Sequence, residues 1–507
     1  GCATSRPDQK RHNRSLERLL RESDTVAALL AFAGRLSVGC DWRPLLFQQF
    51  HDILPGTSIP EVFDQAEPIW RRARRQARHQ RDQGLRQLLG VDSGSGASST
   101  WLWMGWQPLA RWSPLLKLPH GAWHADAAAL PQQPSVQGGT WVQLPEQRGI
   151  CSVALSDGPV DSGEIAPRHP VSVVRVSPEI WRVSNGLVEF ECSSVGLLQL
   201  RDAQGVDQLS APLRPCRYRD RGEFWDAWDI AAEYRRHPLE LEPVGSVQLL
   251  ESGPLVAQLV VTYRVGASRM RLDLRLKADC PWLELIVSVD WCQRHELLRL
   301  DIPLASAAVR LAADTSGGVI ERPAHPQTPR EQERWEVPAI AWLASQAKAP
   351  GGGIAVLLDG PQGVDGATDR LGVSLLRGAT WPDPSADQGQ QRMRLALMPF
   401  QGSWAHAAVP QAAIAFREPG WHGPIAAGQH QASMGTHCWL PAIPSRLCPV
   451  ALRPDANGVV LQLLNPGASR CRWQPGEGWK VGRSVAADDW IELAPGELIE
   501  LRLAQSS

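Results

Sequence analysis

The sequence predicts an α+β protein that is mostly β, with an N-terminal three-helix bundle followed by large antiparallel β-sandwich domains. Apolar residues at three-and-four spacing, typical of amphipathic helices, are concentrated in the first 90 or so residues. Short alternating or apolar runs between Gly and Pro residues follow and predict strands. The 41 Pro and 44 Gly suit the edges and turns of large sheets. A chain of 507 residues also exceeds a single core, so we expect several domains.

Three amphipathic segments account for the predicted bundle. The run "RSLERLLRESDTVAALLAFA" places leucines at helical spacing, and "DWRPLLFQQFH" supplies a shorter second segment. The third segment begins with Ser58 and Glu61, which form a capping box, and Pro60 is tolerated in the first turn. Short connections between these segments favour a small bundle over residues 1–90.

Composition changes after the helices and divides the rest of the chain. "VDSGSGASST", residues 91–100, predicts a Gly/Ser linker. We expect a small β-domain over 101–172, a large antiparallel β-sandwich over 173–435, and a small C-terminal β-domain over 436–507. Asn185-Gly186, in "SNGL", indicates a hairpin turn because both residues tolerate positive φ.

Overall composition excludes several classes of protein. The 52 Lys and Arg nearly balance the 53 Asp and Glu, so no global field favours nucleic acid or an anionic membrane. No run approaches 18 apolar residues, and the first 15 residues lack the apolar core of a signal peptide. Ten Cys without a CxxC pair fit neither a zinc ribbon nor a dense disulfide scaffold. Reduced thiols in the cytoplasm are therefore expected.

The stretch "LLFQQFHDILPGTSIPEVF", residues 45–63, places His51 and Asp52 between a helical run and a Pro-Gly turn. One interpretation is catalytic metal chemistry, because a neutral imidazole is a common metal ligand. The other is an ordinary polar helix end, since a helix C-terminus favours His without any metal. Taken alone, the pair fits the second interpretation better.

The segment "GEFWDAWDIAAEYRRHP", residues 222–238, combines Trp225 and Trp228 with Asp226 and Asp229. Flat aromatic faces beside carboxylates suit a sugar, which has an apolar face and a rim of hydroxyl groups. The two aspartates could equally be turn residues. Residues 375–389, "LLRGATWPDPSADQG", similarly mix Arg377, Asp383 and Asp387 with Trp381 in a Pro/Gly-rich loop.

A basic run, "RRARRQARHQRDQGLR" at 71–86, places several arginines on one helical face. A phosphate-binding face is one interpretation. A solvated outer face of the bundle is favoured, because the overall charge is balanced and no aromatic residues interrupt the run.

The order of several strings resembles the family 38 glycoside hydrolases, the retaining α-mannosidases. "GCATSRPDQKRHNRSLERLL" and the His51 stretch are similar to that family's middle domain. "FWDAWDI", "VDWCQRHELLRLDIPL", "GGVIERPAHPQTPREQERWEVPAIAW" and "VSLLRGATWPDPSADQG" then follow in the order of its C-terminal β-domains. The resemblance covers nearly all of the chain from Gly1 to about Phe400.

The resemblance implies a zinc-dependent glycosidase that acts on mannose-containing oligosaccharides. His51 matches the family's middle-domain zinc ligand, and Asp52 matches a position that lines the sugar site. In such enzymes zinc holds two hydroxyl groups of the terminal mannose, one carboxylate attacks the anomeric carbon, and a second carboxyl acts as acid and base. Trp225, Asp226, Trp228 and Arg377 are the further residues that we expect to bind substrate, and Arg377 is expected to contact a sugar hydroxyl.

This sequence departs from the family pattern because no His-x-Asp pair lies upstream of His51. The family's first domain supplies that pair and the aspartate nucleophile, so no catalytic residue is assigned to this chain and its zinc site is incomplete. We expect hydrolysis to need that domain in cis or in trans, and the surface it covers to promote association, including homo-oligomers. The alternatives are a non-catalytic carbohydrate-binding β-sandwich remnant and a nucleic-acid-binding helical bundle, the latter disfavoured.

Overall fold

The computed structural model describes residues 1–35, 37–89, 100–159, 165–222, 225–348, 351–425, 437–440, 443–444, 446–456, 458–474, 479–481 and 490–505. The predicted linker at 91–100 lies outside these residues except for Thr100. The contacts within the chain define two compact units. Unit 1 comprises Gly1–Arg14, Phe47–Pro68 and Ala166–Val409, and unit 2 comprises Ser15–Leu46, Ile69–Ile165 and Pro410–Ser507.

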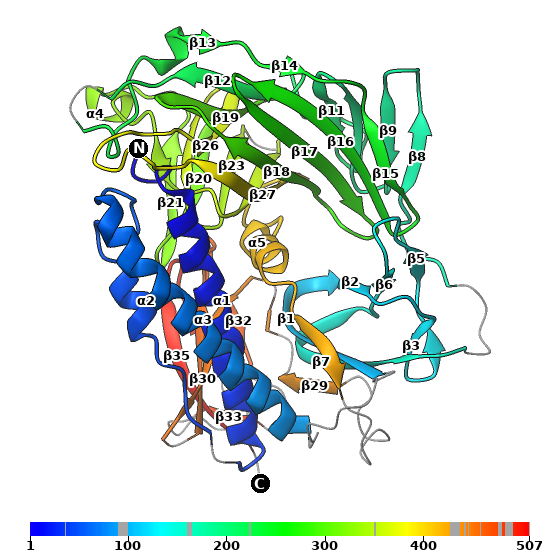
Figure 1. Ribbon diagram of the computed structural model, residues 1–507. Helices are drawn as coiled ribbons and strands as arrows, with labels where there is room; N and C mark the ends of the chain where they lie inside the picture. The colour runs from blue at the N-terminus through cyan, green and yellow to red at the C-terminus, as the bar shows by residue number, and fades with distance from the viewer. Residues whose placement is uncertain are drawn as a thin grey trace. The chain divides into compact units, whose positions relative to one another are not determined.

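Helices occupy the first 89 residues, as predicted (Figure 1). They are α1 (Pro7–Phe32), α2 (Arg43–Gln48) and α3 (Pro60–Leu89). The apolar stripe of α3 is buried, with Phe63, Ala66 and Trp70 all less than 5% exposed. The middle helix has only six residues, and the packing of the three as a bundle remains a prediction. Two further short α-helices and one 3₁₀ helix are α4 (Pro329–Gln332), α5 (Val409–Arg417) and η1 (Tyr234–Arg236).

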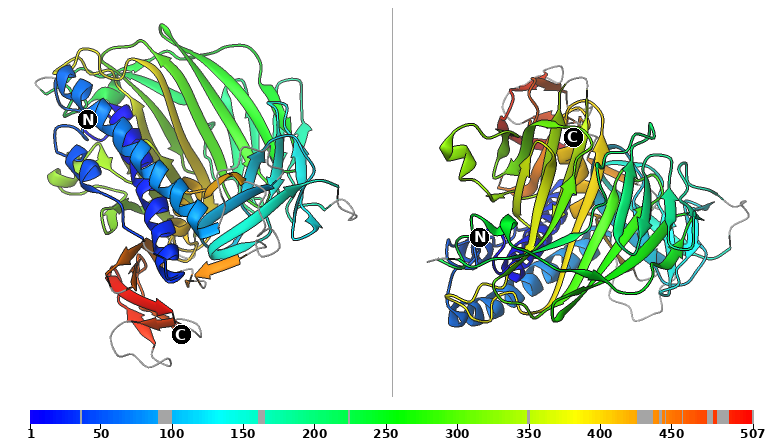
Figure 2. Two further views of the ribbon diagram at one scale, coloured as in Figure 1. Left: turned by 60° about the horizontal axis from the view of Figure 1, so that its bottom comes forward. Right: turned by 90° about the horizontal axis from the view of Figure 1, so that it is seen from above.

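Unit 1 is built mainly from three antiparallel sheets, which confirms the predicted mostly-β class (Figures 1 and 2). The four-stranded sheet has the order β11-β10-β9-β8 and comprises β8 (Ser172–Arg175), β9 (Trp181–Ser184), β10 (Glu189–Ser193) and β11 (Gly196–Arg201). The six-stranded sheet has the order β13-β12-β19-β26-β25-β22 and comprises β12 (Pro215–Arg219), β13 (Pro238–Leu239), β19 (Glu296–Pro303), β22 (Val337–Pro338), β25 (Gly363–Ala367) and β26 (Arg370–Leu376).

The ten-stranded sheet of unit 1 has the order β14-β16-β17-β18-β27-β24-β23-β20-β21, with β15 beside β16. Its strands are β14 (Glu242–Pro243), β15 (Gln248–Ser252), β16 (Val256–Val265), β17 (Ser268–Lys277), β18 (Leu283–Trp291), β20 (Ala308–Thr315), β21 (Gly318–Pro323), β23 (Trp342–Ala347), β24 (Gly353–Asp359) and β27 (Gly389–Phe400). A Cβ on Gly366 of β25 would lie 2.7 Å from Leu311 of β20, so the two larger sheets are in close contact at this point.

The predicted hairpin turn at Asn185-Gly186 joins β9 to β10. Gly186 has a φ of +77°, which glycine adopts at little cost. The Asn185 side chain accepts hydrogen bonds from the backbone N–H groups of Leu187 and Val188. Its amide donates to the carbonyls of Lys277 and Cys280, and so fixes the hairpin to β17 and the turn that follows it.

The described residues of unit 2 form four sheets. The six-stranded one, with β29 beside β7, comprises β1 (Thr100–Trp112), β3 (Trp123–Ala125), β4 (Ala128–Ala129), β7 (Gln147–Asp157), β28 (Trp421–Ile425) and β29 (His437–Leu440). The three-stranded one comprises β2 (Leu115–Leu118), β5 (Gln132–Pro134) and β6 (Thr140–Gln143). The last two comprise β30 (Cys448–Asp455), β31 (Gly458–Leu464), β33 (Trp479–Val481) and β35 (Leu498–Gln505), and β32 (Cys471–Trp473) with β34 (Ile491–Leu493).

Strand β28 lies within the range predicted for the large β-sandwich, 173–435, but it pairs with β1, most of which lies within the range predicted for the small β-domain, 101–172. Among the described residues, no helix combines the length and the hydropathy needed to span a membrane. All ten cysteines are described, and all are free thiols.

Candidate functional site

His51 lies on the surface of unit 1, in the turn between α2 and α3. The backbone N–H groups of Ile53 and Leu54 donate to the carbonyl of Phe50, so the chain turns tightly around the His-Asp pair. The His51 side chain is 79% exposed, and its Nε2 atom lies 3.7 Å from Oδ2 of Asp52. This distance is too long for a hydrogen bond. The imidazole is therefore open to solvent and available to a ligand, rather than packed in a core.

The turn after His51 is fixed to the beginning of α1. The ammonium group of Lys10 donates to the carbonyl of Pro55 at 2.9 Å and to the carbonyl of Ser5. Gly56 has a φ of +81°, and a Cβ there would lie 2.5 Å from Cβ of Arg6. Only glycine allows this close approach without displacing the backbone. The position of the His-Asp pair thus depends on residues of the α1 segment.

Burial lowers the pKa of Lys10 to about 8. An ordinary lysine has a pKa of about 10.4, so the unfolded chain binds this proton more tightly than the folded chain. The resulting penalty on folding is largest below pH 8 and is relieved as the pH rises from about 8 to about 10. We therefore compare the free energy of unfolding of the unchanged chain with that of Lys10→Met. The difference, unchanged chain minus variant, is expected to increase by up to about 3 kcal/mol over this pH range.

Urea denaturation at pH 7, 8, 9 and 10 measures this difference. The matched control is Lys117→Met, which removes an ammonium group from a partly exposed position of β2 and so separates the loss of any lysine from the loss of a buried one. A difference between the unchanged chain and Lys10→Met that stays constant with pH would contradict the prediction.

Several apolar residues close to His51 in the sequence have unusually exposed side chains. Phe47, Phe50 and Ile59 are each half or more exposed. The ring centroids of Phe50 and His51 lie 4.2 Å apart. Exposed apolar side chains that form a contiguous patch often mark a surface that binds a partner or a ligand.

A second group of candidate residues lies on two loops of unit 1, around Trp225 and Trp381. Trp225 is 59% exposed and Trp381 49%, whereas Asp226 is buried. Oδ2 of Asp226 accepts a hydrogen bond from the backbone N–H of Thr380 at 2.6 Å. The N–H of Ala227 donates to the carbonyl of Trp381 at 3.1 Å, so the two loops are joined directly.

Arg377 differs from the expectation that it contacts a sugar hydroxyl, because its side chain is completely buried. Its Nε donates to Oδ2 of Asp220 at 2.8 Å, and its Nη2 lies 3.5 Å from Oδ1 of Asp226. Burial alone would lower the pKa of Arg377, but the two carboxylates raise it above its usual value. Arg377 and Asp226 therefore form an internal ion pair and expose almost no surface to a ligand.

Asp387 joins the loop of Trp381 to the α1 segment. Its Oδ2 accepts from the backbone N–H groups of Arg377 and Gly378, and its Oδ1 accepts from that of Arg6 at 2.7 Å. The Arg6 guanidinium also pairs with Asp383. Sequence reasoning noticed both aspartates in their Pro/Gly loop but not their partner, because residues almost 400 positions apart carry no local signal.

The described residues do not by themselves fit a zinc ion. Structural and catalytic zinc sites use three or four His, Cys, Asp or Glu ligands. The described part of the chain contains no group of three or more such side chains arranged around a metal. His51 with Asp52 supplies at most a fraction of the set.

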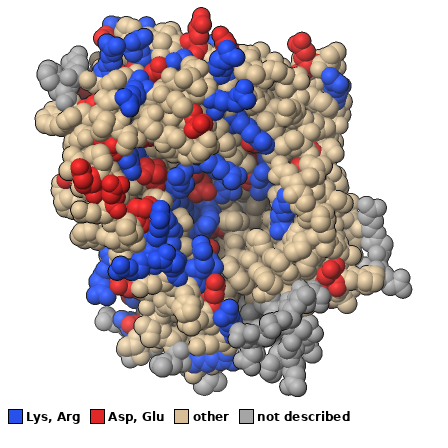
Figure 3. Space-filling view, viewed as in Figure 1, with Lys and Arg blue, Asp and Glu red and all other residues tan. Residues whose placement is uncertain are grey.

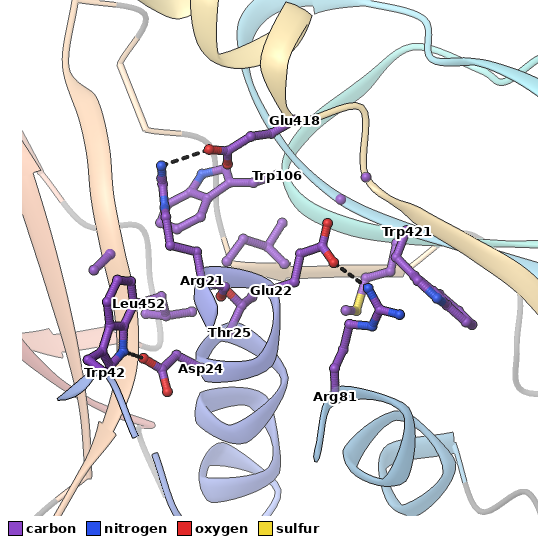
Figure 4. Close-up of a pocket in the computed structure, with 15 residues that line it drawn as sticks. Arg21, Glu22, Asp24, Thr25, Trp42, Arg81, Trp106, Glu418, Trp421 and Leu452 are labelled. Atoms are coloured by element: carbon purple, nitrogen blue, oxygen red, sulfur yellow. Dashed lines mark hydrogen bonds and ion pairs between the residues drawn. The ribbon is translucent and has the colours of Figure 1, made fainter. Parts of the chain in front are cut away.

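Unit 2 contains a pocket between α1, α3 and the adjoining strands, but its carboxylates are already paired (Figure 4). Arg21 pairs with Glu418, Arg81 pairs with Glu22, and the Trp42 indole donates to Asp24. The cavity of about 50 Å³ has room for a water or two and is too small for a sugar ring.

The basic face predicted on α3 is interrupted by acidic residues. Arg71, Arg72, Arg75 and Arg78 are exposed, but Asp64 and Asp82 belong to the same helix. Figure 3 shows Lys and Arg interspersed with Asp and Glu on the face where Figure 1 draws the helices. This mixture is typical of a solvated helix surface and does not favour a nucleic-acid interface.

Comparisons with known proteins identify the family. The model described as "Alpha mannosidase middle domain" matches residues 1–88, and the model described as "Glycosyl hydrolases family 38 C-terminal domain" matches residues 183–385. The fold and these matches relate the chain to the glycoside hydrolases. The chain belongs to glycoside hydrolase family 38 and carries its middle and C-terminal regions, which confirms the resemblance seen in the sequence.

Alpha-mannosidase 2C1 of Homo sapiens is 24% identical over 433 residues, which cover 83% of this chain and 39% of that protein. Alpha-mannosidase G of Dictyostelium discoideum is 28% identical over 191 residues, which cover 37% of this chain and 17% of that protein. The chain thus spans about two fifths of the length of the first of these relatives. A crystal structure of a family 38 protein from Enterococcus faecalis has a TM-score of 0.76 at 14% identity and covers 99% of this chain and 70% of that one. This likeness shows a shared fold.

Proposed function

We propose that this chain is a portion of an α-mannosidase that hydrolyses terminal α-mannosidic bonds with retention. The single observation that supports this most is the exposed His51 within a matched α-mannosidase middle domain. We assign no catalytic residue to this chain. Turnover needs a catalytic domain that supplies the nucleophile, either on the same polypeptide or on another.

His51 is the proposed zinc ligand of this chain, and Asp52 beside it is the proposed contact for a sugar hydroxyl. When bound, zinc would act as a Lewis acid that holds hydroxyl groups of the terminal sugar. The chain's own contribution is geometric. Lys10 and Gly56 fix the turn, so the backbone that carries the imidazole is ordered before any ligand binds.

The exposed Trp225 and the half-buried Trp228 are proposed to contact mannose-containing oligosaccharides. Buried Asp226 and Arg377 are proposed to act on substrate indirectly, because their ion pair holds the loops that carry these rings. Free thiols throughout the described chain support a cytoplasmic location. The exposed Phe47, Phe50 and Ile59 support association through the His51 face, with the catalytic domain or with a second copy.

Release of nitrophenol from an aryl α-mannoside tests the proposal. The chain is assayed alone, and then with the catalytic domain of a family 38 relative added or joined before Gly1. Turnover that appears only in the second case supports the proposed function. An absence of turnover in both, with binding of mannose detected by calorimetry, would instead favour a non-catalytic carbohydrate-binding remnant.

A further inference from the structure

Cys151 and Cys438 stand directly opposite each other on two antiparallel strands of unit 2. Strand β29 runs beside β7 (Figure 1), and the register pairs Cys438 with Cys151 and His437 with Ser152. Residues that are directly opposite in an antiparallel pair have their side chains on the same face of the sheet. The two cysteine side chains are therefore neighbours across the strands, although they are far apart in the sequence.

The backbone at this pair already meets the geometry of a disulfide. Opposite residues of antiparallel strands have Cα atoms about 4.5–5.5 Å apart, which lies within the range of about 4.4–6.8 Å that disulfides use. Their Cβ atoms lie about 4.5–5.5 Å apart, against a mean of about 3.8 Å across a disulfide. A shift of about 1 Å by the shorter strand, β29, is enough to close the bond.

This juxtaposition distinguishes the pair from the other cysteines of the protein. In the described strands, each of the four remaining cysteines is opposite residues of other kinds: Cys192 opposite Trp181 and Leu197, Cys216 opposite Arg299, Cys448 opposite Leu464, and Cys471 opposite Leu493. The register thus selects a single pair of cysteines that can be joined without rearrangement of a sheet.

The two cysteines differ in their access to solvent. Cys438 is exposed. Cys151 is 3% exposed and belongs to an apolar cluster with Trp103, Val153 and Leu155. A bulky oxidant can therefore reach Cys438 but not Cys151. An accessible thiol beside a second, shielded thiol is the arrangement of an attacking and a resolving cysteine in redox-sensitive proteins.

We infer that Cys438 and Cys151 form a reversible redox couple that glutathione disulfide closes. First, Cys438 loses its proton to solvent and its Sγ attacks one sulfur of glutathione disulfide. The S–S bond of glutathione disulfide breaks, and one glutathione leaves as a thiolate and takes up a proton. Next, Cys151 loses its proton and its Sγ attacks Sγ of Cys438, which releases the second glutathione in the same way. The two cysteines lose two electrons in total, and glutathione disulfide is reduced to two molecules of glutathione.

The disulfide would secure an edge of the sheet that few backbone contacts hold. Strand β29 has four residues, and its register with β7 is irregular between Cys438 and Leu440. A covalent bond to β7 restricts the opening of this strand. Because glutathione keeps most thiols of the cytoplasm reduced, the pair would close only when that buffer becomes oxidising. This inference concerns unit 2 alone and is independent of the proposed function.

Disulfide mapping of the 507-residue chain tests the inference. The chain is incubated with glutathione disulfide, alkylated, digested without a reducing agent and analysed by mass spectrometry. We expect a peptide with Cys151 joined to a peptide with Cys438, and dithiothreitol should separate them. Cys292 is the internal control, because it is also exposed but lies outside the paired strands, so it should keep an attached glutathione. Amide hydrogen exchange of His437–Leu440 should slow by about tenfold or more on oxidation.

Two variants separate the roles of the cysteines. In Cys151→Ala, Cys438 should keep the attached glutathione, because the resolving thiol is absent. In Cys438→Ser, Cys151 should stay unmodified, because it is buried. The inference is overturned if Cys438 of the unchanged chain keeps glutathione without a cross-link, or if it joins a cysteine other than Cys151. Because this mapping uses the unchanged chain, it decides the matter even where a variant fails to fold.

Discussion

The variant Arg377→Met is expected to unfold at a markedly lower urea concentration than the unchanged chain, with a loss of about 3–5 kcal/mol. Arg377 and its partner Asp220 are both almost completely buried, and their atoms lie 2.8 Å apart. Removal of the guanidinium leaves the carboxylate of Asp220 charged and without its partner in a site that water hardly reaches. Hydrogen exchange of the peptides around Asp220 and Arg377 localises the loss, since a chain of two units need not unfold in one step.

The control for Arg377→Met is Arg310→Met. Arg310 pairs with Glu321 at the same distance of 2.8 Å, but the two side chains are 56% and 37% exposed. Such surface pairs contribute about 0–1 kcal/mol. The double variant Asp220→Asn/Arg377→Met should recover part of the lost stability, because it removes both buried charges. Equal losses for Arg377→Met and Arg310→Met would show that burial of the ion pair is not what matters.

The variant His51→Ala, in a polypeptide that includes the catalytic domain, is expected to lose its zinc and at least about 100-fold of its turnover. Alanine has no side-chain atom that can coordinate a metal, so the substitution removes the proposed ligand. Because His51 is exposed and its ring supports no core, the substitution should leave the folding of this chain intact. Elemental analysis of the dialysed protein measures the zinc, and aryl α-mannoside hydrolysis measures the turnover.

His79→Ala is the matched control for His51→Ala, because His79 is also an exposed histidine, on α3. It should retain both zinc and turnover. Unchanged zinc content in His51→Ala would contradict the assignment of this residue as a ligand, and the His-Asp pair would then be an ordinary polar helix end.

Sequence patterns were sufficient for the class of fold. Helical spacing is a local property, and it identified the regions that became α1 and α3. The alternation of apolar and polar residues and the positions of Gly and Pro are also local properties. They identified the β region and the turn at Asn185-Gly186. The order of strands could not be predicted in this way. The pairing of β28 with β1 joins residues more than 300 positions apart, and nothing in either strand specifies the other.

The candidate site was predicted less completely than the fold. The exposure of His51 and Trp225 fits their prediction as ligand-contacting residues, which remains a prediction. Composition could not distinguish a carboxylate or guanidinium that faces solvent from one that is paired internally, so Asp226 and Arg377 were expected at the surface. The roles of Ser5, Lys10 and Asp387 depend on contacts between distant segments, which only the structure reveals.

The assembly of unit 1 from three separate stretches has a consequence for protein engineering. Its first 14 residues contribute the hydrogen bonds of Ser5 and Arg6 to loops more than 200 positions away. A chimera that exchanges the helical region with a relative at a single crossover near residue 90 would therefore separate these partners. Recombination of this family would have to transplant Gly1–Arg14 together with the strands that it secures.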